Sequence, residues 1–318
     1  MQVVMCEAYG APESLVVREM PSPVPGPGEV KVRLKARGVS FSDVLRIAGT
    51  YHVKTAPPFI PGGEAAGEII QVGAEVKGLV AGDRVLCGGG YAEETVQAAS
   101  SVIKLPAGVG FEAAASFRSN YTTALYALQR GRLQPGETLL VHGAAGGVGL
   151  ATVDAGKLMG ARVIATARNP ERLEVCKRLG ADHVIDYSKG FREQVLALTN
   201  GRGADVIFDP VGGDVFDESM RCVAPFGRLL IVGFTSGRPG VAKTNHLLVK
   251  DAEVIGFTIG ALGKLDPARA RRNLEVLVDW LGAGRIHPYH SHALPLAQAA
   301  DALKLVVDRK VIGKALLV

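Results

Sequence analysis

The chain has 318 residues, of which 40 are glycine and one is tryptophan. This length allows two domains, and the glycine content favours a turn-rich α/β protein over a helical bundle. The net charge of +5 comes from interspersed charges, which argues against nucleic-acid binding and suits an anionic cofactor. No apolar run approaches the roughly 20 residues of a membrane helix, and residues 1–9 lack a signal-peptide pattern. We therefore expect a cytoplasmic protein that binds no membrane.

Short β-like runs separated by turn signals fill the first third of the chain. Pro25-Gly26-Pro27-Gly28 is one such turn signal. Several short strands at this spacing predict a small barrel. The strands are expected at 30–34, 68–72, 83–86 and 101–105.

From about residue 120, six apolar runs alternate with helical stretches. Such alternation predicts a doubly wound, Rossmann-type domain with a six-stranded parallel sheet. The strands are expected at 138–141, 163–165, 183–185, 206–208, 229–232 and 254–257, and the helices near 149–159, 171–179, 191–198 and 214–222.

The tail has a different pattern, with helices expected at 267–282 and 296–308 and a closing strand at 315–318. We expect it to rejoin the first domain. The predicted boundaries are 1–119 for the first part of that domain, 120–257 for the nucleotide-binding domain and 258–318 for the return segment.

A glycine-rich turn follows the apolar run 138–141. Gly146 and Gly149 fill the second and third places of G-x-G-x-x-G, whereas Ala144 stands in the first. Such a strand-to-helix turn lets backbone amides and the positive helix N-terminus approach a pyrophosphate. In NAD-binding units an acidic residue about 20 positions later bonds the ribose hydroxyl. Here Ala167 takes that place beside Arg168, which can pair with a 2′-phosphate, so the sequence predicts NADPH over NADH.

Short motifs in a fixed order resemble the zinc-independent quinone oxidoreductases of the medium-chain dehydrogenase/reductase superfamily, the group that includes zeta-crystallin. The resemblance covers nearly the whole chain and implies a barrel-like catalytic domain similar to the GroES fold. The motifs are Ala8-Tyr9-Gly10-Ala11-Pro12-Glu13, Gly38-Val39-Ser40-Phe41-Ser42-Asp43 with Arg46 and Gly49, Pro61-Gly62-Gly63-Glu64, Gly82-Asp83-Arg84-Val85, Tyr121-Thr122-Thr123-Ala124, Ala144-Ala145-Gly146-Gly147-Val148-Gly149 and Gly313-Lys314.

The zinc alcohol dehydrogenases of this superfamily carry a cysteine and a histidine ligand where this chain has Ser40 and Gly63. Neither residue is a useful zinc ligand, so no metal site is predicted. The four cysteines are scattered and are expected to be buried structural thiols, although Cys87, beside three glycines, leaves a reactive thiol open. His287, His290 and His292 fit no zinc pattern and are expected at the surface, whereas His142 is expected in the core.

Without a metal, the chemistry suits a hydride donor and an electrophile such as a quinone or an α,β-unsaturated carbonyl. The resemblance implies Tyr51, Ser40 and Arg46 as catalytic candidates. Tyr51 either donates to a carbonyl or only covers the nicotinamide, and Arg46 either contacts substrate or pairs with Asp43 or Glu64. Lys314 either approaches the cofactor or is solvated. The implied cofactor-binding residues are Asn120, Thr123, Ala145, Gly146, Gly147, Val148, Thr166, Arg168, Tyr187, Gly233, Phe234 and Lys314.

The sequence thus favours an NADPH-dependent, zinc-free reductase of quinones or activated enones. Two alternatives stay open: an enoyl-thioester reductase of the acryloyl-CoA type, and a non-enzymatic NADPH-binding protein of the crystallin or RNA-binding kind. Relatives commonly pair through the edge of the nucleotide sheet near 254–258, so a homodimer is expected, with a small-molecule electrophile as the partner.

Overall fold

The computed structural model describes residues 1–51 and 53–318 and divides into two compact units. The first unit joins Met1–Arg118 to Pro288–Val318, and the second is Ser119–His287. The first is built on a mostly antiparallel sheet, in which the last two strands of the chain pair in parallel, and the second on a parallel sheet. The α/β class predicted from the sequence is confirmed.

Strand β3 (Glu29–Val39) organises the first unit because it pairs along both of its edges. One edge is antiparallel to β4 (Ala65–Val72), while the other pairs first with β6 (Glu94–Ala98) and then with β15 (Lys314–Leu317) from the tail. Alternate residues of β3 face the core, as the two-residue period of a strand requires. The sheet order is β14-β15-β3-β4-β5-β7, with β5 (Arg84–Cys87), β7 (Ile103–Lys104) and β14 (His290–Leu294), and a separate ribbon pairs β1 (Gln2–Met5) with β2 (Val16–Glu19).

Helices cover this sheet where its strands end. Helix α11 (Ala299–Val307), preceded by a short 3-10 turn η4 (Leu296–Gln298), packs against α1 (Phe41–Ile47) and β15. Their apolar faces share one core, which includes Val39, Ile47 and Leu303. The remaining short elements are α2 (Phe111–Ala115), η1 (Pro12–Ser14) and η2 (Ala99–Ser101).

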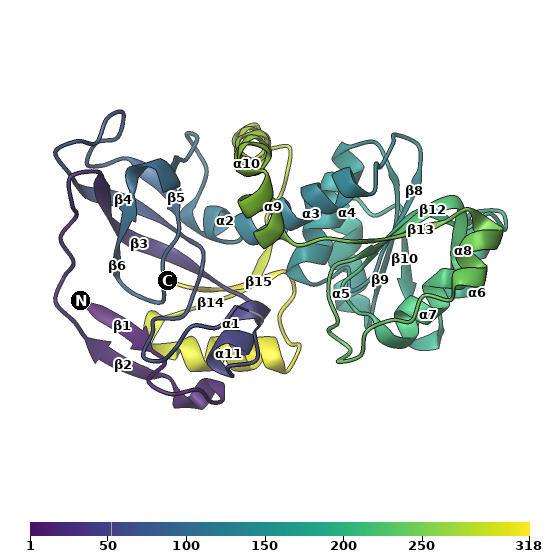
Figure 1. Ribbon diagram of the computed structural model, residues 1–318, viewed down its shortest axis with the longest axis horizontal. Coiled ribbons are helices and arrows are strands. Elements are labelled where there is room, and N and C mark those ends of the chain that lie inside the picture. The colour runs from purple at the N-terminus through teal and green to yellow at the C-terminus, as the bar shows by residue number, and fades with distance from the viewer. Residues whose placement is uncertain (52) are drawn as a thin grey trace. The chain divides into compact units, whose positions relative to one another are not determined.

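The second unit has the predicted six-stranded parallel sheet, whose strands lie side by side in Figure 1. Their order is β10-β9-β8-β11-β12-β13, so the chain winds outward from β8 in both directions. Every residue of β8 is buried, as expected for a parallel strand covered on both faces. The strands are β8 (Thr138–Val141), β9 (Arg162–Ala167), β10 (His183–Asp186), β11 (Ala204–Asp209), β12 (Val223–Ile231) and β13 (Glu253–Gly256).

Helices connect these strands and pack on their neighbours in the sheet. Helix α4 packs on β8 and β9, α5 on β9 and β10, and α7 on β11 and β12. The helices are α3 (Arg118–Arg130), α4 (Gly147–Leu158), α5 (Pro170–Arg178), α6 (Arg192–Leu198), α7 (Gly213–Cys222), α8 (Thr244–Lys250), α9 (Ile259–Leu265) and α10 (Pro267–Gly282), with a 3-10 turn η3 (Tyr187–Lys189).

Helix α10 belongs to the second unit, although the predicted return segment began at residue 258. Gln129 of α3 forms hydrogen bonds with α10: it donates to Asn273 Oδ1 over 2.9 Å and accepts from Arg269 Nη2 over 3.0 Å. These polar bonds and the buried face of α10 keep the helix on the nucleotide unit. The chain consequently returns to the first unit at Pro288, about 30 residues later than the pattern indicated.

His142, at the end of β8, is a core residue, as predicted. Ser219 Oγ donates to the carbonyl of Val215, so the His142 Nε2–H donates to Ser219 Oγ over 2.8 Å. The Nδ1 atom lies 3.0 Å from Thr166 Oγ1, which can donate to it. Both ring nitrogens are thus satisfied in the neutral form, and burial lowers the His142 pKa to about 3.

The burial of His142 predicts that the free energy of unfolding decreases as the pH is lowered from about 6. The unfolded state takes up a proton near pH 6.5 but the folded state only near pH 3, so acid favours unfolding in that window. One such group changes the free energy of unfolding by about 1.4 kcal/mol per pH unit. Urea denaturation at several pH values from 7 to 4 gives the free energy of unfolding of the wild-type protein and of His142→Gln. Plotted against pH, this free energy should fall less steeply for the variant. Equal slopes would contradict the assignment.

Candidate cofactor and substrate sites

The glycine turn between β8 and α4 is held in shape by its own backbone. The amide of Ala144 donates to the carbonyl of Thr166 over 3.0 Å, and that of Gly146 donates to Gly143 over 2.9 Å. Helix α4 then begins at Gly147, where the first amides of a helix have no intrahelical acceptor. Gly147 and Val148 are only half-buried. The turn therefore offers amides and a positive helix end to an anion.

Gly149 and Gly146 are needed for different reasons. A Cβ atom added to Gly149 would lie 2.4 Å from the Gly143 carbonyl oxygen, so only glycine lets α4 pack this closely on the turn. A Cβ atom on Gly146 would meet only that same oxygen, at 3.3 Å. The space in front of Gly146 is thus open, as a cradle for a pyrophosphate must be.

Three loops meet at the carboxyl ends of β8, β11 and β12. A Cβ atom on Gly143 would lie 3.3 Å from Pro210, which follows β11, and the Thr235 amide donates to the Pro210 carbonyl over 3.1 Å. The buried Asp209 carboxylate accepts from the amides of Val211 and Gly212 at 2.7 and 2.9 Å, while burial raises its pKa. Ligands of doubly wound sheets bind at this edge, where the strand order reverses.

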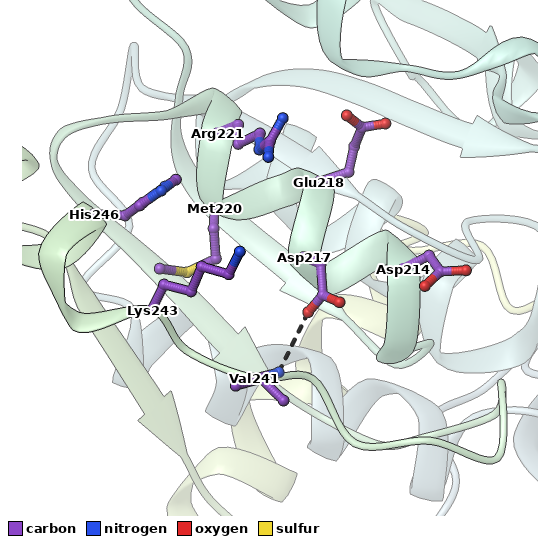
Figure 2. A pocket seen from close by; sticks show the side chains of 8 residues that line it. All are labelled: Asp214, Asp217, Glu218, Met220, Arg221, Val241, Lys243 and His246. Carbon is purple, nitrogen blue, oxygen red and sulfur yellow. Dashed lines mark hydrogen bonds between the residues drawn. The ribbon is translucent and has the colours of Figure 1, made fainter.

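Gly233 and Phe234 lie in the loop after β12, and Phe234 is about half exposed. The loop continues into a segment that is fastened to α7 by Arg238, whose guanidinium is 2.7 Å from Asp214 and 3.0 Å from Asp217. Figure 2 shows Asp217 also accepting from the Val241 amide, beside a 260 Å³ cavity lined by charges of both signs. These bonds hold the segment that follows the loop against α7.

The end of β9 combines a cation with an aromatic ring. The Arg168 guanidinium lies over the ring of Tyr187, 5.0 Å from its centre, and is exposed, whereas Ala167 is buried. Arg168 and Lys189 both lower the pKa of Asp186, although its hydrogen bonds with Ser188 contribute more. Lys189, two residues after Tyr187, is a second cation of this cluster that the sequence analysis did not single out.

The other predicted cofactor residues of this unit have supporting positions. Asn120 of α3 lies against Gly147, because a Cβ atom added there would be 2.6 Å from the Asn120 amide nitrogen. The Thr123 hydroxyl donates to the Ser119 carbonyl over 2.7 Å. Ala145 and Thr166 are buried, and Thr166 holds both His142 and Ala144. Thr166 therefore shapes the turn from below.

In the first unit, Ser40 and Lys314 are brought together although 274 positions separate them. The Lys314 ammonium donates to Ser40 Oγ over 2.8 Å and forms an ion pair with Glu64 Oε1. The side chains of Lys314 and Glu64 are each only 4% exposed. Gly38 makes room for the pair, since a Cβ atom there would lie 2.6 Å from Glu64 Oε1.

Asp43 and Tyr91 extend this cluster inward. Asp43 Oδ2 accepts from the Ser40 amide and from the Tyr91 hydroxyl, both at 3.0 Å. Burial raises the pKa of Asp43, and the charges of Lys314 and Arg46 partly oppose that shift. Tyr91 is fully buried and was missed by the sequence analysis, because it stands outside the recognised motifs.

Tyr51 and Arg46 lie together at the end of α1. The Arg46 guanidinium is 5.1 Å from the centre of the Tyr51 ring, within the range of a cation–π contact. Both side chains are half-buried. Three catalytic candidates, Ser40, Arg46 and Tyr51, thus share one short stretch of the first unit.

Among residues 1–51 and 53–318, no three histidine, cysteine or acidic side chains gather as a metal site would require. The three tail histidines have separate neighbours: the His287 amide donates to Asp154, His290 lies 3.2 Å from Glu112, and His292 lies 2.7 Å from Ser291. All four cysteines are buried, as predicted. Burial raises the Cys87 pKa to about 12, which argues against a reactive thiol. Within the same described residues, no helix has the length and apolar character to cross a bilayer.

Comparison with known proteins agrees with both units. Residues 26–107 match the alcohol dehydrogenase GroES-like domain, and residues 147–279 match the family described as zinc-binding dehydrogenase. A quinone oxidoreductase-like protein 2 homolog of Nematostella vectensis is 38% identical over 98% of this chain and 87% of its own length. This chain belongs to the quinone oxidoreductase-like family of the medium-chain dehydrogenase/reductase superfamily.

Other relatives cover nearly the whole chain. A 2-haloacrylate reductase of a Burkholderia species is 33% identical over 97% of this chain and 96% of its own. The quinone oxidoreductase of Thermus thermophilus, solved also with NADPH, is 31% identical with a TM-score of 0.87, covering 100% of this chain and 99% of its own. The Escherichia coli quinone oxidoreductase in complex with NADPH is 28% identical with a TM-score of 0.88 and full coverage of both chains. The GroES-like and Rossmann architecture predicted from the sequence is confirmed.

Alanine at the two glycines of the turn is expected to change stability by different amounts. Gly149→Ala should lower the free energy of unfolding of the ligand-free protein by about 2–3 kcal/mol, because its Cβ atom would overlap backbone. Gly146→Ala, the matched control, should leave it within about 1 kcal/mol, since φ −78° and ψ 168° suit alanine. Urea denaturation without cofactor measures both, and similar losses would show that the close approach at Gly149 is misassigned.

Proposed function

We propose that this protein is an NADPH-dependent reductase that transfers hydride to quinones or activated α,β-unsaturated carbonyls without a metal. The observation that carries the proposal is the pairing of an open glycine turn with a cation at the end of β9. Quinone oxidoreductases with the same fold were solved with NADPH, which supports the choice of cofactor. The 2-haloacrylate reductase among the relatives supports a substrate whose C=C bond is conjugated to a carbonyl group.

The second unit has residues that fit both ends of NADPH. The amides at Gly146, Gly147 and Val148 suit the pyrophosphate. Arg168 suits the 2′-phosphate, because a guanidinium gives two charge-assisted bonds to such a group and Ala167 stands where NAD-binding units carry a carboxylate. Bound there, the cofactor supplies a hydride at its nicotinamide ring.

The first unit supplies polar groups, and two of its positions differ from the zinc-binding members of the superfamily. Ser40 and Gly63 offer neither thiolate nor imidazole, and Ser40 already bonds to Lys314. A conjugated carbonyl is electrophilic without a Lewis acid, so the protein needs only to orient it and to stabilise the oxyanion that forms. Ser40, Arg46 and Tyr51 carry donors suited to that task. We also propose a homodimer formed through β13, the edge strand of the parallel sheet, and a cytoplasmic location.

The proposal predicts NADPH oxidation with electrophiles and no dependence on metal. The purified protein should oxidise NADPH with a panel of quinones and enones, and treatment with a chelator should leave the rate unchanged. Crotonyl-CoA belongs in the panel, because a preference for it would favour the enoyl-thioester alternative. NADPH binding without turnover on any substrate would favour a non-enzymatic role, and loss of activity on chelation would contradict the metal-free mechanism.

Arg168 predicts cofactor selectivity. Arg168→Ala should weaken NADPH binding roughly 10- to 100-fold, because a charge-assisted pair contributes about 1.5–3 kcal/mol, and should leave NADH binding little changed. Lys177→Ala, which removes one exposed cation from α5, is the matched control and should leave both affinities unchanged. Titration of each coenzyme by fluorescence or calorimetry measures the effect. An equal loss for NADH and NADPH would refute the role of Arg168 in selectivity.

A further inference from the structure

We propose that Ser40 and Lys314 form a proton relay: the Ser40 hydroxyl protonates the oxyanion of the reduced substrate, and the Lys314 ammonium returns a proton to the serine. This inference rests on the proposed reductase function. It gives Lys314 a role in proton transfer and not in contacting the cofactor.

The hydrogen bonds set the direction of the relay. Lys314 has only donors, so Ser40 Oγ is the acceptor of the 2.8 Å bond between them. A hydroxyl that accepts in this way keeps its own hydrogen for another acceptor. Ser40 is half-buried, whereas Lys314 behind it is buried. In the relay, the exposed part of Ser40 is its hydroxyl, which meets the ligand while the lysine stays enclosed.

Both members of the pair are held by separate carboxylates. Glu64 forms the ion pair with Lys314, and Asp43 accepts from the Ser40 amide. Burying an ammonium without a partner costs several kcal/mol, and the ion pair with Glu64 offsets that cost. The other ionisable groups of the cluster are Arg46 and Tyr91, which interact with Asp43. The Lys314 ammonium is therefore held by a carboxylate within hydrogen-bonding distance of the Ser40 hydroxyl.

The burial of Lys314 argues against a solvated tail lysine, the alternative considered from the sequence. Its exposed neighbour Lys310, also in the tail, shows the contrast: its side chain is 66% exposed and it pairs with the exposed Asp308 at 3.5 Å. Lys314 is the first residue of β15. The next residue, Ala315, pairs with Val39 of β3, which directly precedes Ser40. The sheet register, and not a flexible side chain, brings the ammonium to the serine.

The proposed step balances as follows. Hydride addition to the substrate carbon moves the π electrons onto the carbonyl oxygen. The oxyanion takes the proton from Ser40 Oγ, forming an O–H bond, and Ser40 Oγ takes a proton from Lys314 Nζ. Lysine is left neutral and, once the product has left, regains a proton from water by way of the Ser40 hydroxyl. The net reaction consumes one NADPH and one proton, and the serine and lysine end unchanged.

The test is the dependence of the rate on the basicity of the oxyanion. Ser40→Ala should lower kcat roughly 100-fold for an enone that gives a basic enolate, within the range expected for general-acid catalysis. It should lower kcat less than about 5-fold for a quinone that gives a weakly basic quinol anion, since that anion needs no enzyme-bound acid. Ser40→Thr, which keeps a hydroxyl, should restore most of the enone rate. NADPH affinity should be unchanged in both variants.

Lys314→Met tests the second half of the relay, with Lys310→Met as the matched surface control. Lys314→Met should show the same selective loss on the enone, and the Ser40→Ala/Lys314→Met double variant should be no slower than the slower single variant. Lys310→Met should behave as the wild type. If Lys314→Met fails to fold because Glu64 loses its partner, the Ser40 variants still decide the matter, since they leave that ion pair intact.

Two outcomes would overturn the relay alone: equal losses on the enone and the quinone, or a weakened NADPH affinity in Lys314→Met with kcat unchanged. The second outcome would indicate that Lys314 contacts the cofactor and takes no part in proton transfer. If the wild-type protein oxidises NADPH with neither substrate, the proposed function fails and the relay fails with it.

Discussion

Helix α4 begins directly above the end of β8 because residue 149 has no side chain. The carbonyl of Gly143 occupies the space where a Cβ atom would stand. This close approach lets the amides at the start of α4 open onto the carboxyl edge of the sheet. The same turn rests on Thr166 of β9 and on Pro210 after β11, so both halves of the parallel sheet position it. A neutral His142, hydrogen-bonded at both ring nitrogens, supports the turn from the core. The candidate phosphate site is therefore a property of the whole second unit.

The first unit depends on a different constraint, a buried cation that needs a partner. Lys314 comes from the tail, Glu64 from the residue before β4, and Ser40 from the turn between β3 and α1. A buried ion pair contributes little net stability, but it is costly to break, so it favours one register of β15 against β3. The discontinuity of this unit follows from the same requirement, since the tail must return for the cluster to form.

The parallel strands were predicted within two residues at each end, except that β12 begins six residues before its predicted start, because buried strands have nearly continuous apolar runs. β3 was predicted to end at 34, yet it continues to Val39. The apolar signal fades after Leu34 because the small residues Ala36 and Gly38 take the next alternate positions. The Arg37 guanidinium is in fact buried, with its donors on the carbonyls of Ala92 and Leu34. Such a partner is set by tertiary structure and leaves no local signal. The same holds for Gln129, which keeps α10 on the second unit, and for the contact between Lys314 and Ser40.

The two units differ in the kind of charge they offer. The second presents amides and Arg168, which suit phosphates that keep their charge throughout a reaction. The first presents a hydroxyl backed by an ammonium, and such a pair can give up a proton as well as stabilise an anion. Reduction of a conjugated carbonyl consumes a hydride and a proton, whereas a metal ion would stabilise the oxyanion without protonating it. An enclosed lysine behind a reachable serine therefore matches the stoichiometry of a reductase, and the polar cluster of the first unit is consistent with the cofactor chemistry inferred from the second.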